Sequence, residues 1–362
     1  MIDNIANNAY NYTQGVWKMK KATMQDVAKL AGVSQSTVSF VFSGADMRIS
    51  ESTKQKVFEA ASELGFVPRG KLKNYHKVSD SVLALLVPNM SNLYYPALAK
   101  EVDEIAAAKG YGLIVINTNR SETKEARYFK LLISLKVAGI LYGFTPAAGE
   151  METARRLGLP VAIVGETEPG TAADCVSLNS GLAGELLAEH LLHFGHKKIA
   201  VITAPKHSIT LSRKRRIDGM KRVLSGRAEL IVISGDTEQE MEHANYEIEL
   251  GYQKTKELFE IGGGRPTAVV GINDMTAIGI LKALQELGLK VPEDVSCAGF
   301  DNLPVSEFVS PALTSVDHLT AQRTRQAIDL IDDKINKRNK YPVTVDFQPR
   351  LVVRSSTQKA KI

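Results

Sequence analysis

The chain has 362 residues, of which 44% are hydrophobic and 23% are charged, and its formal net charge is +5. This length suffices for a large core and at least one accessory domain, while the longest apolar runs are strand-length and exclude a membrane span. The two cysteines, Cys175 and Cys297, are too few for a disulfide framework, so a reducing cytoplasm is expected.

Residues 1–20 are rich in Asn and Tyr and are expected to form a disordered extension. They contain no basic start followed by a continuous apolar stretch, so a secretory leader is not expected. Met19, which two lysines follow, would be a natural alternative start of the protein.

Residues 21–67 have the pattern of three short helices. Thr23 is the expected cap of the first, and Gly32 gives the backbone the freedom for a sharp turn after it. The apolar face of this helix would consist of Val27, Ala28, Leu30 and Ala31. The third helix is expected to begin after Ser50 and to end at Gly65. Its inward residues would be Val57, Ala60, Ala61 and Leu64.

The second helix follows a Ser34 cap, with Val38 and Val41 pointing inward and the other side free to enter a DNA major groove. The expected DNA contacts of this head are Thr23, Ser34, Gln35, Ser36, Thr37, Ser39 and Phe40. A three-helix pattern also suits an ordinary bundle, but residues 17–77 hold 11 Lys and Arg against 5 Asp and Glu, and residues 78–362 are neutral overall. A basic head on a neutral body favours nucleic-acid binding.

The run from Thr23 to Ser39 resembles the opening of the LacI/GalR family of bacterial transcription regulators, Thr-x-x-Asp-Val-Ala-x-x-Ala-Gly-Val-Ser-x-x-Thr-Val-Ser, at every fixed position. The later signatures Ile49-Ser50, Leu64-Gly65-Phe66 and Pro68 also match, and the resemblance continues to about Thr357. It implies an all-α helix-turn-helix head at 21–67, a hinge at 68–80 and a two-lobed α/β effector-binding and dimerisation domain at 81–357, with a periplasmic-binding-protein-like fold.

The hinge departs from the family pattern. Relatives place Ala four residues and Leu seven residues after the hinge Pro and wedge the paired Leu side chains into the minor groove. Counted from Pro68, the Ala position is Leu72 and the Leu position is Tyr75. Gly70 weakens a helix at this point, and Lys71 and Lys73 add phosphate contacts. Tyr75 serves as a larger wedge, or Leu72 takes the role in a shifted register, or the hinge does not intercalate.

From residue 82, apolar strand-like runs alternate with amphipathic helical stretches, which predicts parallel sheets covered by helices on both faces. The eight runs are 82–87, 112–116, 139–142, 161–164, 199–203, 230–233, 268–271 and 295–298. They form two groups, so we expect a first lobe at 81–194 and 317–342 and a second at 195–316 and 343–357. The expected crossings lie near Gly195, Asp317 and Val343.

Ligands of open α/β sheets bind beyond the carboxyl ends of the strands, where this chain carries several carboxamides and carboxylates. Such residues suit a ligand with many hydroxyl groups, although each could simply cap a helix. The resemblance selects five of the residues in this part of the chain as lining the cleft: Asn92, Tyr95, Arg216, Asn273 and Asp301.

Two departures bear on the effector. Residues 176–180 lack a carboxylate that is common in relatives, and Thr237 stands where sugar-binding members often have an aromatic residue. Residues 213–216 are four successive cations, of which two or three could simply be solvated. Our hypothesis is an anionic effector, a sugar acid or sugar phosphate, held by Arg216 with help from a neighbour.

The chain shows no signature of a catalytic centre or a phosphate loop, so neither an enzyme nor a cofactor is expected. His190, His193 and His196 are spaced by three, but Gly195 ends their helix before the last of them, and a metal site is not expected.

The sequence therefore predicts a cytoplasmic, nucleoid-associated transcription regulator, by family default a repressor, that binds a palindromic double-stranded DNA operator as a homodimer. A small-molecule effector would close the cleft and change the separation of the two hinges. The helix face with Ile278, Leu281 and Leu284 either joins the dimer interface or packs on its own sheet. A catabolite-control regulator with a phosphorylated carrier protein as corepressor and a transporter's solute-binding protein are alternatives, and a tetramer is left open.

Overall fold

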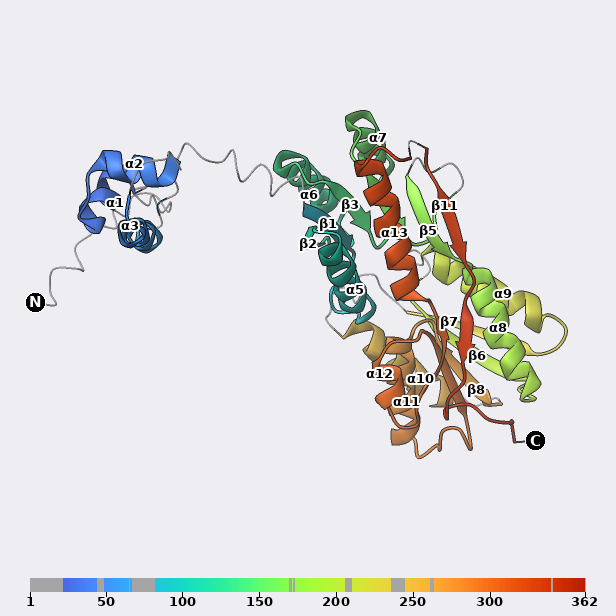
Figure 1. Cartoon of the computed structure of the whole chain (residues 1–362). Coiled ribbons are helices and arrows are strands. Elements are labelled where there is room, and N and C mark those ends of the chain that lie inside the picture. Colours follow the sequence, from blue (N-terminus) through green and yellow to red (C-terminus); the bar gives the residue numbers. More distant parts are fainter. Residues whose placement is uncertain are drawn as a thin grey trace, which may run out of the picture. The chain divides into compact units, whose positions relative to one another are not determined.

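The computed structural model describes residues 22–43, 49–64, 66, 82–168, 171, 173–205, 210–235, 245–260, 264–339 and 341–361. The chain divides into two compact units, 1–78 and 79–362 (Figure 1). The predicted extension and hinge, with Lys71, Leu72, Lys73 and Tyr75, lie outside the described residues, as does Thr237.

The head consists of α1 (Met24–Ala31), α2 (Gln35–Ser43) and α3 (Glu51–Glu63). Each predicted cap is present. Thr23 forms a capping box with Asp26, Ser34 Oγ accepts from the Thr37 amide at 3.1 Å, and Ser50 Oγ accepts from the Thr53 amide at 3.2 Å. Gly32 ends α1 with a φ of +65°, the left-handed conformation that favours glycine.

A small hydrophobic core holds the head together, and it contains Val27, Ala28, Val38, Val57, Ala60 and Ala61. The prediction of burial is wrong for two residues: Leu30 is 46% exposed and Leu64 is 37% exposed. Leu30 lies to one side of the stripe formed by residues 24, 27, 28 and 31, which faces the other helices. Leu64 follows the last residue of α3 and is no longer held against the bundle.

The first lobe of the body is a parallel sheet in the order β11-β5-β4-β3-β1-β2. Its strands are β1 (Val82–Val87), β2 (Gly112–Asn117), β3 (Gly139–Tyr142), β4 (Val161–Val164), β5 (Asp174–Leu178) and β11 (Thr344–Phe347). On one face, α5 (Tyr94–Ala108) and α13 (Thr320–Ile335) lie side by side (Figure 1). On the other face pack α6 (Glu122–Leu135) and α7 (Ala148–Leu157).

The second lobe repeats this plan with the order β12-β10-β9-β8-β6-β7. Its strands are β6 (Lys198–Thr203), β7 (Glu229–Ser234), β8 (Ala268–Gly271), β9 (Ser296–Asp301), β10 (Thr314–Asp317) and β12 (Arg350–Val352), which is antiparallel to β10. One face carries α8 (Ser180–His193) and α9 (Leu211–Leu224), and the other carries α10 (Tyr246–Glu260) and α11 (Asp274–Glu286). A short α12 (Val305–Phe308) follows β9.

Glycines let the paired helices of the second lobe touch through their backbones. A Cβ added to Gly184 of α8 would lie 1.9 Å from the Arg216 carbonyl oxygen, and one added to Gly279 of α11 would lie 1.9 Å from that of Ile248. Real Cβ atoms do not approach an oxygen so closely, so each glycine sets the helix spacing.

The structure corrects two lobe boundaries. The helix α8 belongs to the core of the second lobe, so the first crossing lies at Asn179 and not near Gly195. The strand β11 pairs with β5 of the first lobe, so the last crossing follows Phe347 and not Val343. The other crossing runs from β10 to α13, between Asp317 and Thr320.

Two places were predicted for the helix face with Ile278, Leu281 and Leu284, the dimer interface or the sheet of its own lobe. The structure shows it packed on its own sheet. Leu281 and Leu284 are buried in the core of their own lobe, and only Ile278 remains half-buried.

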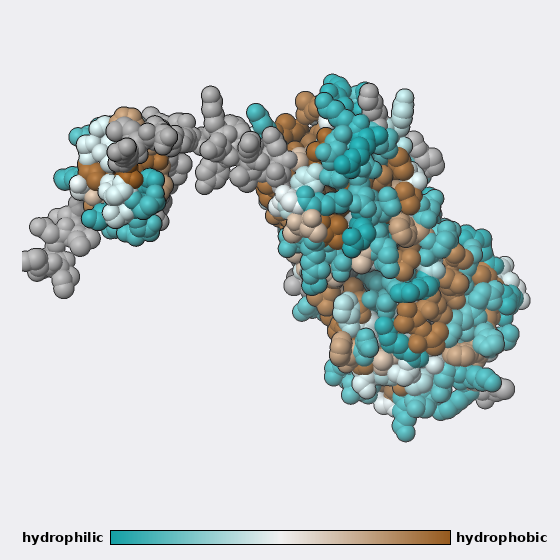
Figure 2. Space-filling view, in the orientation of Figure 1, coloured by the Kyte–Doolittle hydropathy of each residue, from teal (hydrophilic) through white to brown (hydrophobic). Residues whose placement is uncertain are grey.

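The visible surface of the body is largely hydrophilic with smaller hydrophobic patches (Figure 2). Among the described residues, no helix has the length and apolar character needed to cross a membrane.

Candidate functional site

A cavity of about 510 Å³ opens between the two lobes of the body. It lies beyond the carboxyl ends of the strands, where the strand order of each sheet reverses, which is the usual ligand position in such sheets. All five predicted effector residues line it: Asn92, Tyr95, Arg216, Asn273 and Asp301. Asn117, at another strand end, does not line it, and its Oδ1 accepts from the Asn119 amide at 3.1 Å.

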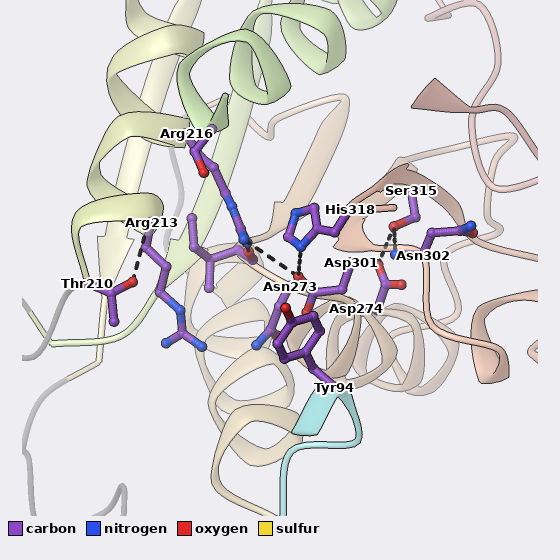
Figure 3. Close-up of polar contacts among 12 residues, drawn as sticks. Tyr94, Thr210, Arg213, Arg216, Asn273, Asp274, Asp301, Asn302, Ser315 and His318 are labelled. Carbon is purple, nitrogen blue, oxygen red and sulfur yellow. Dashed lines mark hydrogen bonds and ion pairs between the residues drawn. The ribbon is translucent and has the colours of Figure 1, made fainter. Parts of the chain in front are cut away.

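Arg216, Asp301 and His318 form a buried polar cluster on the second-lobe wall (Figure 3). Asp301 Oδ1 lies 3.6 Å from Arg216 Nη2 and 3.1 Å from His318 Nδ1. Arg216 Nη1 also donates to the Ile272 carbonyl at 2.7 Å, and its guanidinium carbon lies 5.0 Å from the centre of the Phe300 ring. Arg216 is therefore held in place by an acid, a carbonyl and an aromatic face.

Burial controls the ionisation of this cluster. It raises the pKa of Asp301 to about 8 against the opposing effect of Arg216. Burial also lowers the pKa of His318 well below its ordinary value, with Arg216 and Arg323 acting in the same direction. His318 is therefore neutral near pH 7, and Arg216 carries the positive charge of the cluster.

Arg213 reaches the same cavity and was not predicted as a site residue. Thr210 caps α9 by accepting from the Arg213 amide at 3.4 Å, so the first turn of the helix carries this arginine to the cleft (Figure 3). Its guanidinium pairs with buried Glu247, which also accepts from the side-chain amide nitrogen Nδ2 of Asn92 in the first lobe. Burial disfavours the charge on Arg213, but Glu247 outweighs it and raises the pKa of Arg213.

Of the four successive cations at 213–216, two are buried and two are not. Arg213 and Arg216 are buried in the cavity wall, Lys214 is exposed, and Arg215 is partly exposed. Arg215 Nη1 lies 3.0 Å from buried Glu166 of the first lobe.

Glu166 supplies a carboxylate beside the segment 176–180 that lacks one. Its Oε1 accepts from the Ser180 amide at 2.7 Å, and both residues line the cavity. Sequence reasoning missed Glu166 because it stands alone in the loop after β4, with no motif around it.

Four buried nitrogen atoms at the cavity have no hydrogen-bond partner within the described ranges. They are Arg216 Nε, Asn273 Nδ2, His318 Nε2 and Arg323 Nε. The amide oxygen of Asn273 caps α11 by accepting from the Thr276 amide at 2.9 Å, which leaves its nitrogen free for a ligand. Nitrogen donors in a polar cavity suit a ligand rich in oxygen acceptors.

The predicted DNA-contacting residues of the head divide into two groups. Gln35, Ser36, Ser39 and Phe40 are exposed along α2, and Phe40 is 38% exposed. Thr23, Ser34 and Thr37 instead have their hydroxyl groups in helix caps. The helix N-termini that they cap can still bind phosphate through their amides.

Two of the three spaced histidines have other partners. His190 Nε2 lies 2.9 Å from the Thr357 hydroxyl, and His196 contacts the Thr267 hydroxyl at 2.8 Å and the Gln358 carbonyl at 3.1 Å. The described part of the chain contains no group of three or more His, Cys, Asp or Glu side chains that could hold a metal ion.

A helix-turn-helix head on a two-lobed α/β body defines a class of ligand-responsive DNA-binding proteins. Residues 23–69 match the family model described as bacterial regulatory proteins, lacI family, and residues 188–357 match a periplasmic binding protein-like domain. These matches agree with the architecture of both units.

Known proteins support the same assignment along nearly the whole chain. It is 30% identical over 339 residues to the HTH-type transcriptional repressor PurR of Vibrio atlanticus, covering 93% of this chain and 99% of that protein. It is 31% identical over 346 residues to the HTH-type transcriptional regulator DegA of Bacillus subtilis, covering 93% and 98%. The solved complex of the transcriptional regulator CelR with cellobiose is 25% identical, with a TM-score of 0.65 and coverage of 93% and 100%. The chain belongs to the LacI family of bacterial regulatory proteins.

Proposed function

We propose that this regulator represses transcription as a homodimer on a palindromic operator, and that a small polar ligand in the interlobe cavity changes its affinity for DNA. The observation that carries the proposal is the cavity, because both lobes contribute buried polar side chains to it. A ligand that contacts both lobes favours one arrangement of them over the other. Similarity to a complex that holds cellobiose supports a sugar-like ligand.

The exposed side of α2 is the proposed reading surface. Gln35 can bond to an adenine edge, and Phe40 can contact a thymine methyl group but cannot bond to guanine. One short helix contacts only a few base pairs, so two heads are needed for specificity. Similarity to proteins named repressors supports the direction of control.

One edge strand of each lobe offers apolar surface for the dimer. Val115 on β2 and Val232 on β7 are both exposed, although each belongs to a strand that is otherwise part of a hydrophobic sheet. Edge strands with apolar side chains are natural contact surfaces. We propose that the two protomers meet along this side of each lobe.

The test is a mobility shift with a duplex selected from a randomised palindromic library, combined with sedimentation to count protomers. Gln35→Ala should weaken binding to the selected duplex by about 10- to 100-fold, the usual cost of a lost bidentate base contact. Gln55→Ala, an exposed glutamine of α3, is the matched control and should have no effect. Equal binding by the wild type, Gln35→Ala and Gln55→Ala would contradict the proposal, and so would one protomer per duplex.

A further inference from the structure

We infer that the effector carries a carboxylate group and that Arg323 is the residue that selects it. This inference rests on the proposed effector role of the cavity and adds to it the chemical class of the ligand.

Arg323 differs from the other two buried arginines of the described chain. Arg213 pairs with Glu247 and Arg216 with Asp301, but Arg323 has no carboxylate partner among the described residues. It is 3% exposed, lines the cavity from the first turn of α13, and leaves its Nε without a partner. A buried cation without a counter-charge is costly, so a ligand anion is its natural partner.

The one hydrogen bond that the Arg323 side chain makes to the described residues does not explain its presence. Its Nη2 donates to the Val176 carbonyl at 3.0 Å, and that oxygen already accepts from the Gly165 amide at 3.1 Å. The Val176 carbonyl would therefore still have a hydrogen-bond partner without the arginine. A guanidinium has five N–H groups, so most of its donors are left for a ligand.

Three acids around the cavity already face cations, and buried Glu125 accepts from the Ala147 amide at 3.0 Å. Asp301 faces Arg216 and His318, Glu166 faces Arg215 and the Ser180 amide, and Glu247 faces Arg213 and Asn92. Arg323 is thus the buried arginine of the described cavity wall that has no carboxylate within ion-pair distance. One negative charge balances it, and a carboxylate carries that charge on two oxygens that match a guanidinium.

The remaining free atoms indicate hydroxyl groups on the same ligand. Arg216 Nε and Asn273 Nδ2 can donate to hydroxyl oxygens, and His318 Nε2 can donate or accept according to its tautomer. Arg216, which the sequence suggested as the anion holder, has Asp301, the Ile272 carbonyl and the Phe300 ring around its guanidinium, so it leaves fewer donors for a ligand anion than Arg323 does. The geometry points to a polyhydroxy monocarboxylate of the sugar-acid class.

The test is thermal denaturation of the full-length protein with glucose, gluconate, glucuronate, galactose, galacturonate and glucose 6-phosphate. At least one sugar acid should raise the melting temperature of the wild type more than its neutral counterpart. Arg323→Gln should weaken the binding of that acid by about 10- to 100-fold, because it removes a hydrogen bond to a charged group. Arg323→Lys should recover part of the affinity. Arg325→Gln, an exposed arginine on the same helix, is the control and should bind as the wild type does.

A second measurement needs no ligand. Because Arg323 is an unpaired buried charge, Arg323→Gln should leave the melting temperature of the ligand-free protein unchanged or raise it; a fall relative to Arg325→Gln would show a structural role and overturn the inference. Stabilisation by neutral sugars alone or by glucose 6-phosphate alone would also overturn it, while leaving the effector role intact. That role is tested by adding the same compounds to the mobility shift: a compound that stabilises the protein without changing DNA affinity contradicts the effector role and not the anion site.

Discussion

The two lobes of the body share one strand order but are built from different contacts. In the second lobe, glycines such as Gly184 and Gly279 bring paired helices together through their backbones. In the first lobe, α5 and α13 instead pack through larger side chains such as Val102 and Ile328. The cleft walls differ as well, since the buried arginines of the second lobe have acidic partners, whereas Arg323 of the first has none in the part of the chain that the structure describes.

This difference separates what topology determines from what individual side chains determine. The repeated topology places strand ends and helix starts around one cavity in both lobes. It does not determine which charges meet there. The following variants test whether paired charges and close glycine contacts make the second lobe the more sensitive of the two.

The largest effect should come from Glu247→Gln. The change leaves Arg213 buried without a counter-charge, which typically costs about 3–5 kcal/mol of the free energy of unfolding. Chemical denaturation of the variant measures this cost. Glu249→Gln, two residues along α10 and exposed, is the control and should stay within about 0.5 kcal/mol of the wild type. Equal stability of both variants would mean that the pair does not hold the second-lobe wall together.

The next largest effect should come from Gly184→Ala. Its Cβ would meet the Arg216 carbonyl oxygen, so α8 and α9 must move apart, at a cost of roughly 1–3 kcal/mol. Gly149→Ala in α7 of the first lobe has nothing within 4 Å and should leave stability unchanged or raise it by up to about 1 kcal/mol. The melting temperatures of the two variants compare the lobes directly. A lower melting temperature in both variants would contradict the predicted difference between the lobes.

A smaller effect should appear as a pH dependence. Burial raises the pKa of Asp301 to about 8, so the folded protein holds this proton more tightly than the unfolded chain, and its contribution to stability is lost as pH rises towards 8. The lowered pKa of His318 changes stability by less than about 0.5 kcal/mol above pH 6.5, because the unfolded imidazole is already half neutral there. Between about pH 6.5 and 8 the wild type should lose about 1–2 kcal/mol that Asp301→Asn does not lose. Parallel profiles of the two proteins would contradict the raised pKa.

The smallest effect should come from Arg215→Gln. Arg215 pairs with Glu166 across the cleft, but its side chain is 42% exposed, and solvent screens such a pair to about 0–1 kcal/mol. The Ser180 amide still bonds to Glu166 in the variant. Denaturation of this variant beside Glu247→Gln shows whether burial decides the value of an interlobe ion pair. A large loss in Arg215→Gln would show that it does not.

The sequence predicted the strands that are apolar along their whole length. β1, β3, β4 and β8 are buried on both faces and read as continuous hydrophobic runs. β5 and β10 were missed because their buried faces contain polar residues that find partners only in the fold. Asp174 pairs with Lys334, and Ser315 donates to Asp274.

The site could be predicted only as far as local motifs reach. Family motifs carry the five predicted lining residues, and all five lie at the cavity. Glu247 was missed because it is far along the chain from Arg213, and no pattern links the two. Arg323 was missed because the chain returns to the first lobe just before α13, so a helix that reads as ordinary begins at the cleft.

The pairing of β11 with β5 has a consequence for how the protein is made. The first sheet takes residues 344–347 as its outermost strand, next to a strand formed by residues 174–178. A ribosome must therefore synthesise almost the entire polypeptide before that sheet is complete, whereas the helices of the head are contiguous and available from the start. In gene terms, the head can be exchanged as a single cassette, but an exchange of either lobe requires two separate segments from each partner.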